Sequence, residues 1–195
     1  MIKALRNSWK AIVWCLFFYF SAALLVKGGC NIFLSILLVI FVFLFSSLIH
    51  EIGHWAMAKV FGVKTYEISV SFKPFVFKIR MGIQQIDFRI AMIAMAGPAT
   101  NILIGIISLS FLFFLSSVLW IKFLFYYIYF LNICFSLGML APYKISESLF
   151  SDGKWVEIFI RADYKKRQKL IIGLIYFSLM IASWTSLLFV YFLKP

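Results

Sequence analysis

Residues 50–54 of this chain read HEIGH and contain both of its histidines. On an α-helix, positions four apart lie on one face, so His50 and His54 can offer two imidazole nitrogens to one metal ion. Glu51 lies one step round the helix, where its carboxylate can take a proton from water beside the metal, as in the helical zinc motif H-E-x-x-H. The motif ends an apolar run from Ile32 to Ile49. Because ionisable groups at membrane depth are costly, this position favours a functional role over a structural histidine pair.

A third metal ligand must come from elsewhere, because a catalytic zinc has three protein ligands and one open position. Asp152 is the best candidate. It follows the fourth apolar run, in an Asp152-Gly153 step whose glycine permits a tight backbone turn near a metal. A solvated loop turn explains the same step equally well. The other carboxylates outside the motif are Glu67, Asp87, Glu147, Glu157 and Asp163.

The composition indicates a multispanning membrane protein. Hydrophobic residues make up 64% of the 195 positions, and the mean hydropathy of +1.01 lies far outside the range of soluble domains. The net charge of +12 does not indicate nucleic-acid binding, because the basic residues are spread among apolar spans. The three cysteines have no C-x-x-C spacing, which argues against a disulfide framework or a cysteine metal site. We expect one membrane domain over residues 1–195, embedded in the lipid bilayer.

Five apolar segments are long enough to cross a bilayer as helices. The first is a helix over 9–27 that resembles a secretory signal peptide, but its length and its end without a small-residue cleavage site favour a retained span. The second runs from Ile32 to about Phe61, with Gly62 as a C-cap. The others are expected at 90–115, 120–141 and 170–193, with the domain core over 32–155.

Between the second and third spans, the apolar period changes from helical to two. The segment from Val63 to Arg89 contains three alternating sets, broken at Lys73-Pro74 and Met81-Gly82. The apolar members are Ile68, Val70 and Phe72, then Phe75, Phe77 and Ile79, then Ile86 and Phe88. This pattern predicts two or three short strands that form a small sheet at the cytoplasmic interface.

The third span carries Gly97, Pro98 and Asn101 in mid-membrane. A Gly-Pro step is expected to interrupt the helix and free backbone groups, and Asn101 places an amide in an apolar run. These residues can serve a substrate. The alternative is ordinary, because Gly and Pro are frequent in membrane helices and an asparagine can simply join two helices.

The basic residues divide unevenly between the two sides of the membrane. Of the 19 Lys and Arg residues, 16 fall at the N-terminus or in the two polar segments from Lys59 to Arg89 and from Lys144 to Lys169. By the positive-inside rule, we expect a multi-pass protein of the cell membrane with its N-terminus in the cytoplasm and its C-terminus outside. The metal motif then opens toward the cytoplasm.

Three motifs in this order resemble the site-2 protease family of intramembrane zinc metalloproteases. They are the H-E-x-x-H motif at the end of a span, the Gly-Pro…Asn segment in the next span, and a proline followed by Asp-Gly after the span that follows, together covering about 32–155. Two features depart from the family pattern. Asp152 comes ten residues after Pro142, which is longer than usual, and no asparagine lies shortly before Pro142.

The resemblance implies a role for each motif. His50, His54 and Asp152 would bind Zn²⁺, and Glu51 would act as the general base. Asn101, with Gly97 and Pro98 beside it, would help to hold the substrate or the oxyanion. The chain resembles a minimal member of the family without PDZ or CBS modules.

The sequence thus predicts a zinc-dependent intramembrane endopeptidase that cleaves a membrane-embedded or membrane-leader peptide near the cytoplasmic side. The alternative is a non-catalytic membrane protein, with an immunity or chaperone-like role, that retains the metal motif. A membrane non-haem iron oxygenase fits less well, because such sites need more than two histidines.

Overall fold

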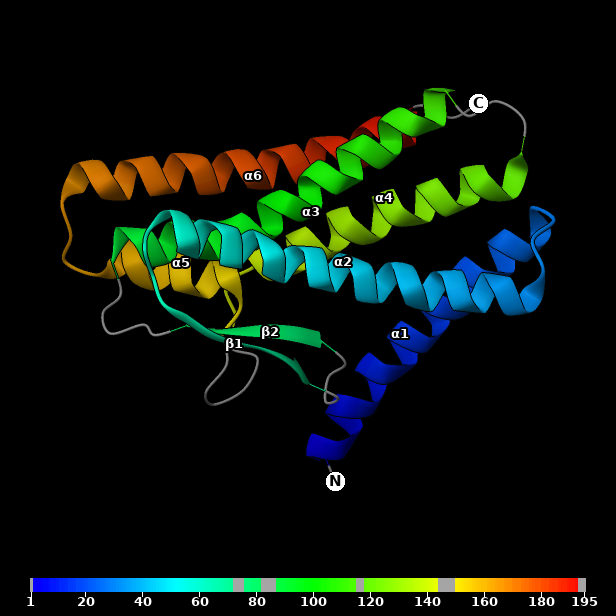
Figure 1. The fold of residues 1–195 in the computed structure, drawn as a ribbon, viewed down its shortest axis with the longest axis horizontal. Helices are drawn as coiled ribbons and strands as arrows, with labels where there is room; N and C mark the ends of the chain where they lie inside the picture. Colours follow the sequence, from blue (N-terminus) through cyan, green and yellow to red (C-terminus); the bar gives the residue numbers. More distant parts are fainter. Residues whose placement is uncertain (1, 72–75, 82–86, 115–117, 144–149, 193–195) are drawn as a thin grey trace.

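The computed structural model describes residues 2–71, 76–81, 87–114, 118–143 and 150–192. In this part of the chain, long helices run side by side and a β-hairpin lies along one flank of the bundle (Figure 1). The elements are α1 (Ile2–Lys27), α2 (Ile32–Val60), β1 (Thr65–Ser71), β2 (Val76–Met81), α3 (Phe88–Phe114), α4 (Leu119–Leu140), α5 (Asp152–Arg161) and α6 (Lys166–Phe192).

Among the described residues, four helices are long and apolar enough to cross a membrane. They are Ile32–Val60, Phe88–Leu112, Leu119–Leu140 and Lys166–Ser186. The apolar stretch found in α1, Cys15–Lys27, is shorter. The α1 helix itself begins at Ile2, several residues before the predicted start at residue 9, and α6 begins at Lys166 rather than at residue 170.

Local residues fix both ends of α2. Asn31 caps the first turn, because its side-chain oxygen accepts a hydrogen bond from the backbone N–H of Phe33. At the other end, Phe61 is the C-cap residue and Gly62 follows it with a φ of +66°. Glycine suits this left-handed conformation because it has no Cβ. Gly62 therefore ends the helix within one residue of the predicted boundary.

The segment after α2 forms a hairpin in which β1 and β2 pair antiparallel, with Ile68 opposite Ile79 and an irregularity between Thr65 and Glu67. The third predicted strand is wrong for its last residues, because Phe88 already begins α3, and the rest of that set lies outside the described residues. The reason is a helix cap: the Oδ1 atom of Asp87 accepts a hydrogen bond from the backbone N–H of Ile90 at 3.2 Å.

The predicted interruption of the third span is also wrong, because α3 continues through Gly97 and Pro98. Neighbouring side chains bind the backbone carbonyls around the proline. The Ser136 hydroxyl of α4 donates to the Pro98 carbonyl at 3.1 Å, and the Thr100 hydroxyl donates to the Ala96 carbonyl at 2.8 Å. A proline is tolerated in a membrane helix when side chains satisfy the backbone in this way.

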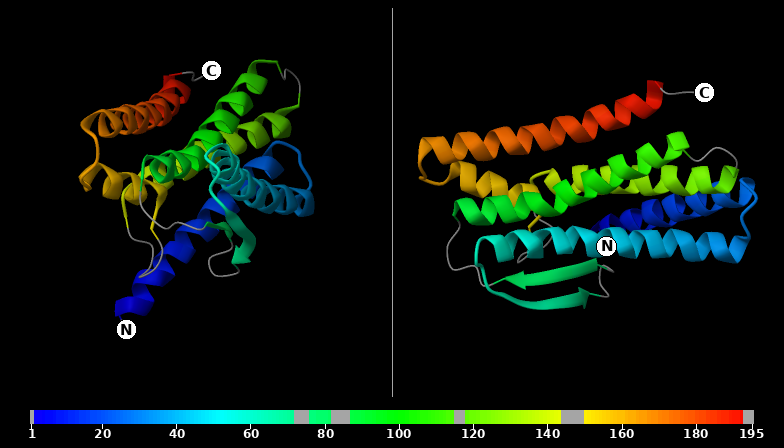
Figure 2. Two further views of the ribbon diagram at one scale, coloured as in Figure 1. Left: turned by 60° about the vertical axis from the view of Figure 1, so that its left-hand side comes forward. Right: turned by 45° about the horizontal axis from the view of Figure 1, so that its top comes forward.

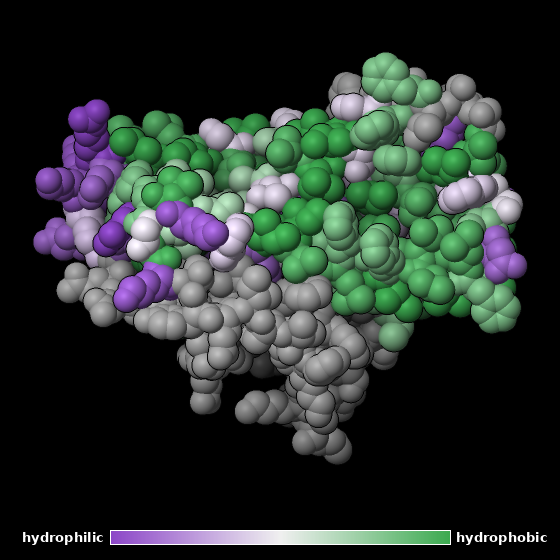
Figure 3. All heavy atoms as spheres, in the orientation of Figure 1, coloured by the Kyte–Doolittle hydropathy of each residue, from purple (hydrophilic) through white to green (hydrophobic). Residues whose placement is uncertain are grey.

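The helices pack in layers, with α6 against α3, α3 against α2, and the hairpin beside α2 (Figure 2). The contact between α2 and α3 is close because small residues face each other, with Gly53 of α2 opposite the backbone of Ala96 in α3. Apolar side chains cover most of the visible surface of the bundle, and hydrophilic residues gather at one end (Figure 3). That end carries the exposed residues Arg161, Lys165, Lys166 and Arg167.

Candidate metal centre

His50 and His54 lie on one face of α2 and are almost fully buried, with side-chain exposures of 1% and 6%. Their Nε2 atoms are 3.1 Å apart. The Nδ1 atom of His54 donates a hydrogen bond to the backbone carbonyl of Ile93 in α3, at 2.7 Å. Because that carbonyl can only accept, the proton of a neutral His54 ring is held on Nδ1. The lone pair on Nε2 then faces His50 and is available to a cation.

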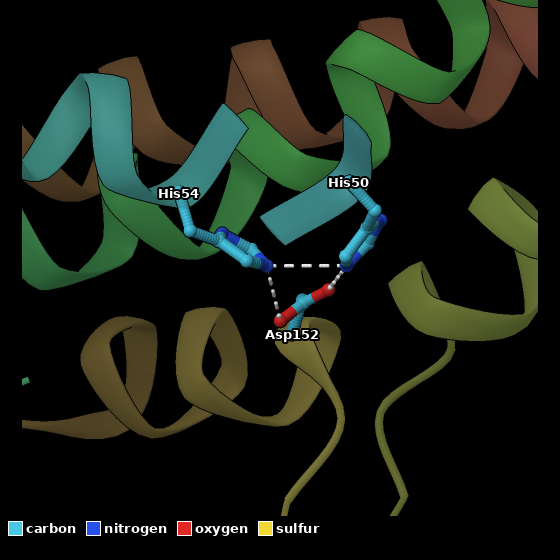
Figure 4. A group of neighbouring side chains, drawn as sticks. All are labelled: His50, His54 and Asp152. Atoms are coloured by element: carbon cyan, nitrogen blue, oxygen red, sulfur yellow. Dashed lines mark hydrogen bonds and ion pairs between the residues drawn. The ribbon is translucent and has the colours of Figure 1, made fainter. Parts of the chain in front are cut away.

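Asp152 meets the two histidines from the opposite side, at the start of α5 (Figure 4). Its Oδ2 atom lies 3.0 Å from the Nε2 atom of His50, and its Oδ1 atom lies 3.4 Å from the Nε2 atom of His54. In all, the ligand atoms of the three side chains lie within 4.8 Å of one another. The structure thus places Asp152 beside the histidines, 98 residues after His54 in the chain.

This donor set fits zinc. Two imidazole nitrogens and one carboxylate oxygen are ordinary zinc ligands, and a tetrahedral ion with bonds of about 2.0–2.1 Å holds its ligand atoms about 3.3 Å apart. The two imidazole nitrogens, 3.1 Å apart, lie close to that value, and each has a carboxylate oxygen of Asp152 near it, Oδ2 at 3.0 Å from His50 and Oδ1 at 3.4 Å from His54. Three protein ligands also leave a fourth position open, as in catalytic rather than structural zinc sites.

The charge of Asp152 suits a cation site. Burial by itself would raise the pKa of the carboxyl group, but the neighbouring imidazoles of His54 and His50 outweigh burial and hold the pKa below its usual range. The carboxylate is therefore ionised at neutral pH. An anionic oxygen between two imidazoles gives the centre the polarity that a divalent cation needs.

Asp152 stands in the first turn of a helix, which corrects the predicted tight Asp-Gly turn. Ser151 is the N-cap of α5, and its hydroxyl oxygen accepts a hydrogen bond from the backbone N–H of Lys154 at 3.3 Å. Val156 and Phe159 then bury one face of α5 against α3 and α6. The serine before an apolar i, i+3 pair was a sequence signal for this helix.

Ser151 also closes the longer connection between Pro142 and Asp152. Its hydroxyl donates to the Ala141 carbonyl at 2.6 Å and accepts from the backbone N–H of Tyr143 at 3.0 Å. Its own backbone N–H donates to the Tyr143 carbonyl at 3.1 Å. The chain therefore leaves the end of α4 at Tyr143 and returns to it at Ser151. This closure brings Asp152 back to the end of α4 despite the ten-residue spacing.

Two glycines allow the backbones around the centre to come close. A Cβ atom at Gly153 would overlap the carbonyl oxygen of Leu140, so only glycine lets α5 begin against the end of α4. A Cβ atom at Gly97 would lie 2.5 Å from His54 Nε2 and 2.7 Å from His50 Nε2. Gly97 of α3 thus forms one wall of the metal centre.

The remaining predicted site residues lie on α2 and α3. Glu51 is half-buried on α2, directly after His50. Pro98 follows Gly97 in α3, and Asn101 lies one helical turn beyond Gly97. Asn101 is completely buried, and neither polar atom of its side chain has a hydrogen-bond partner among the described residues. An unpaired buried amide costs about 1–3 kcal/mol, so a partner for it is expected in function.

Sequence reasoning missed the residues that hold the ligands in place. The Ile93 carbonyl is a backbone group and leaves no signal in the side-chain pattern. Phe135 of α4 packs edge-to-face on His50, with ring centroids 5.3 Å apart, but its position resembles any other aromatic residue of an apolar span. Only Ser151 had a recognisable pattern, as an N-cap.

Replacing Ser151 with alanine is expected to weaken zinc binding by about 10- to 100-fold, the usual effect of removing a group that orients a metal ligand. The change removes the helix cap and the contacts to Ala141 and Tyr143, so Asp152 is no longer held at the histidines. Zinc affinity can be measured by competition with a chelator. Ser110→Ala, which removes an exposed serine hydroxyl from α3, is the control. Equal zinc affinity in both variants would contradict this role of Ser151.

Comparison with known proteins identifies the family. The model of peptidase family M50 matches residues 38–191, which include every residue of the metal centre. No curated protein and no solved structure matches the chain. Because the match covers most of the chain, and because the paired histidines and the aspartate converge as a metal-binding group, the chain belongs to peptidase family M50, the site-2 protease family of metallopeptidases.

Proposed function

We propose that this protein is a zinc-dependent intramembrane endopeptidase that cleaves a membrane-embedded or membrane-leader peptide near the cytoplasmic side. The observation that carries the proposal is the convergence of His50, His54 and Asp152 within a bundle of apolar helices. A partly buried carboxylate and two buried imidazoles are costly in such a place and are typical of functional sites. Residues 1–195 would act as one membrane-embedded catalytic domain, with α1 as a fifth span.

Each residue of the centre has a part in peptide hydrolysis. His50, His54 and Asp152 would hold the zinc ion, which when bound supplies a Lewis acid that activates water and polarises the scissile carbonyl. Glu51 takes the proton from the attacking water and passes it to the leaving amine, as general base and then general acid. The His54–Ile93 hydrogen bond keeps the His54 ring in the required orientation and tautomer.

Asn101, Gly97 and Pro98 would serve the substrate. The Asn101 amide is buried without a partner among the described residues, so it can donate a hydrogen bond to a substrate carbonyl or oxyanion. Gly97 lets α3 approach the imidazoles closely. Pro98 has no backbone N–H and so removes one helical hydrogen bond in this region.

The substrate must unwind locally, because a peptide bond inside a helix is shielded and its carbonyl is hydrogen-bonded. The β1–β2 hairpin lies beside α2 and can receive the unwound segment by pairing along the outer edge of one strand (Figure 1). A short extended substrate segment would then run past the metal centre.

The proposal is tested by Glu51→Gln. Glutamine has the same size and shape as glutamate but cannot accept the proton. Cleavage is therefore expected to fall by about 10²- to 10⁴-fold, the usual contribution of general acid–base catalysis. Zinc content should stay at one ion per chain. The membrane peptides of cells with wild type and with Glu51→Gln can be compared by mass spectrometry for a substrate that accumulates uncut.

Two results of that comparison would contradict the proposal. A wild-type protein without zinc would exclude a metalloprotease. A zinc protein whose peptide products are unchanged by Glu51→Gln would favour a non-catalytic binding role instead.

The topology gives a separate prediction. The described basic residues gather where α2 ends and α6 begins, which we assign to the cytoplasm by the positive-inside rule (Figure 3). A reporter fused after Pro195 is therefore expected outside the cell, and one fused after Lys166 is expected in the cytoplasm. Alkaline phosphatase and green fluorescent protein fusions measure the two locations. The reverse result would exclude an N-inside arrangement of five spans.

A further inference from the structure

An apolar pocket of about 340 Å³ lies between α1 and α4. Phe17 of α1 lines one side, and Phe130, Cys134 and Gly138 are among the residues of α4 that line the other. None of the described residues that line it is charged. For comparison, an apolar cavity of about 150 Å³ is large enough to bind benzene, so this pocket can accept an aromatic or a large aliphatic side chain.

The pocket adjoins the metal centre through two of its lining residues, Phe135 and Tyr143. The Phe135 ring forms part of its wall and also packs edge-to-face on His50 at 5.3 Å between centroids. At its other end the pocket reaches Tyr143, which is hydrogen-bonded to Ser151, the residue directly before Asp152. A peptide whose carbonyl lies at the centre would therefore carry its neighbouring side chain to this pocket, since consecutive Cα atoms are only about 3.8 Å apart.

Gly138 keeps the pocket open. A Cβ atom built at this position meets no other atom of the described residues within 4 Å, so a larger side chain would enter this space without colliding with them. This differs from Gly97 and Gly153, where a Cβ atom would collide with other groups. The packing of α4 against the described residues therefore does not require glycine at position 138.

We infer that the α1–α4 pocket binds a large apolar side chain of the substrate beside the scissile bond, and that Gly138 determines the size of the side chain accepted. The inference rests on the proposed function, because it places the scissile carbonyl at the metal centre. The occupant is a peptide side chain rather than a lipid chain because the pocket adjoins His50 and the turn that carries Asp152. Peptides with Leu, Met or Phe at that position should be preferred over peptides with Ala.

The test uses the purified full-length protein with bound zinc and two peptide hydroxamates. The hydroxamate group binds zinc, and the two compounds differ only in the adjacent side chain, which is benzyl in one and methyl in the other. Even one methylene group in an apolar pocket can change affinity about tenfold, so the benzyl compound is expected to bind wild type at least about tenfold more tightly. Gly138→Leu should abolish this preference in a protein that still holds its zinc ion.

Gly173→Leu is the matched control. Gly173 lies in α6, also has open space around its Cβ position, and is not among the pocket residues. It should keep the benzyl preference. A preference that persists in Gly138→Leu, or that is absent in wild type, would overturn the inference. If wild type binds neither zinc nor the methyl compound, the proposed function itself has failed.

A second measurement needs no substitution. Cys134 lines the pocket, whereas Cys15 is exposed on α1 and is not among the lining residues. The benzyl hydroxamate should slow alkylation of Cys134 but not of Cys15, as measured by mass spectrometry. Protection of Cys134 by added phospholipid alone, with equal affinity for both hydroxamates, would identify a lipid chain as the occupant and overturn the inference.

Discussion

Purified His54→Ala is expected to lose its zinc and all peptidase activity. The free energy of zinc binding at sites with four ligands is about 10–16 kcal/mol. Removal of one ligand is therefore expected to cost roughly 3 kcal/mol, or about two orders of magnitude in affinity. The chain has no histidine outside the motif that could replace it. The change also removes the 2.7 Å hydrogen bond that His54 Nδ1 donates to the Ile93 carbonyl. Metal content by mass spectrometry and zinc affinity by chelator competition measure the loss.

The control is Ile52→Ala. Ile52 lies on the same helix, between the two histidines in sequence, but it is 41% exposed and does not belong to the metal-binding group. This variant should keep one zinc ion and wild-type activity, which separates ligand loss from damage to α2. A His54→Ala protein that still holds one zinc ion at wild-type affinity would show that His54 is not a ligand.

Asp152→Asn is expected to weaken zinc binding strongly and remove activity. The amide keeps the size of the side chain but lacks the negative charge that faces His50 at 3.0 Å and His54 at 3.4 Å. A neutral amide oxygen is a much poorer zinc ligand than a carboxylate. Zinc affinity should therefore fall by about the same factor as in His54→Ala, and the loss should not depend on α5 unfolding, because Ser151 still caps the helix.

Glu157→Gln is the matched control on the same helix. Glu157 forms ion pairs with Lys154 and Arg161, each at 2.7 Å, and does not belong to the metal-binding group. The hydrogen bond from Lys154 and the charges of Lys154 and Arg161 lower the pKa of Glu157. Zinc binding should be unchanged. Zinc loss in Glu157→Gln, with zinc kept in Asp152→Asn, would show that Glu157 rather than Asp152 is the third ligand. Glu147, the other near alternative, lies outside the described residues.

The fold was largely predictable where the signal was local. Helices α2, α3 and α4 begin and end within about two residues of the predicted spans, because long apolar runs and caps such as Gly62 act within a few residues. The errors also have local causes that a pattern of hydrophobicity does not report. Asp87 capped a helix where alternation suggested a strand, and side chains from neighbouring helices kept α3 intact at Pro98.

The sequence by itself determined the pair of histidines, since positions four apart must share a helix face whatever the rest of the fold does. It also determined the membrane environment, because apolar surface of this extent cannot be buried by 195 residues in water. Only the tertiary structure decided which of the other carboxylates meets the pair. That choice depends on closure between Tyr143 and Ser151, on the cap of α5, and on the contact of Gly153 with Leu140. These are contacts between different elements, and their free energy comes from docking rather than from any local preference of the Asp152-Gly153 step.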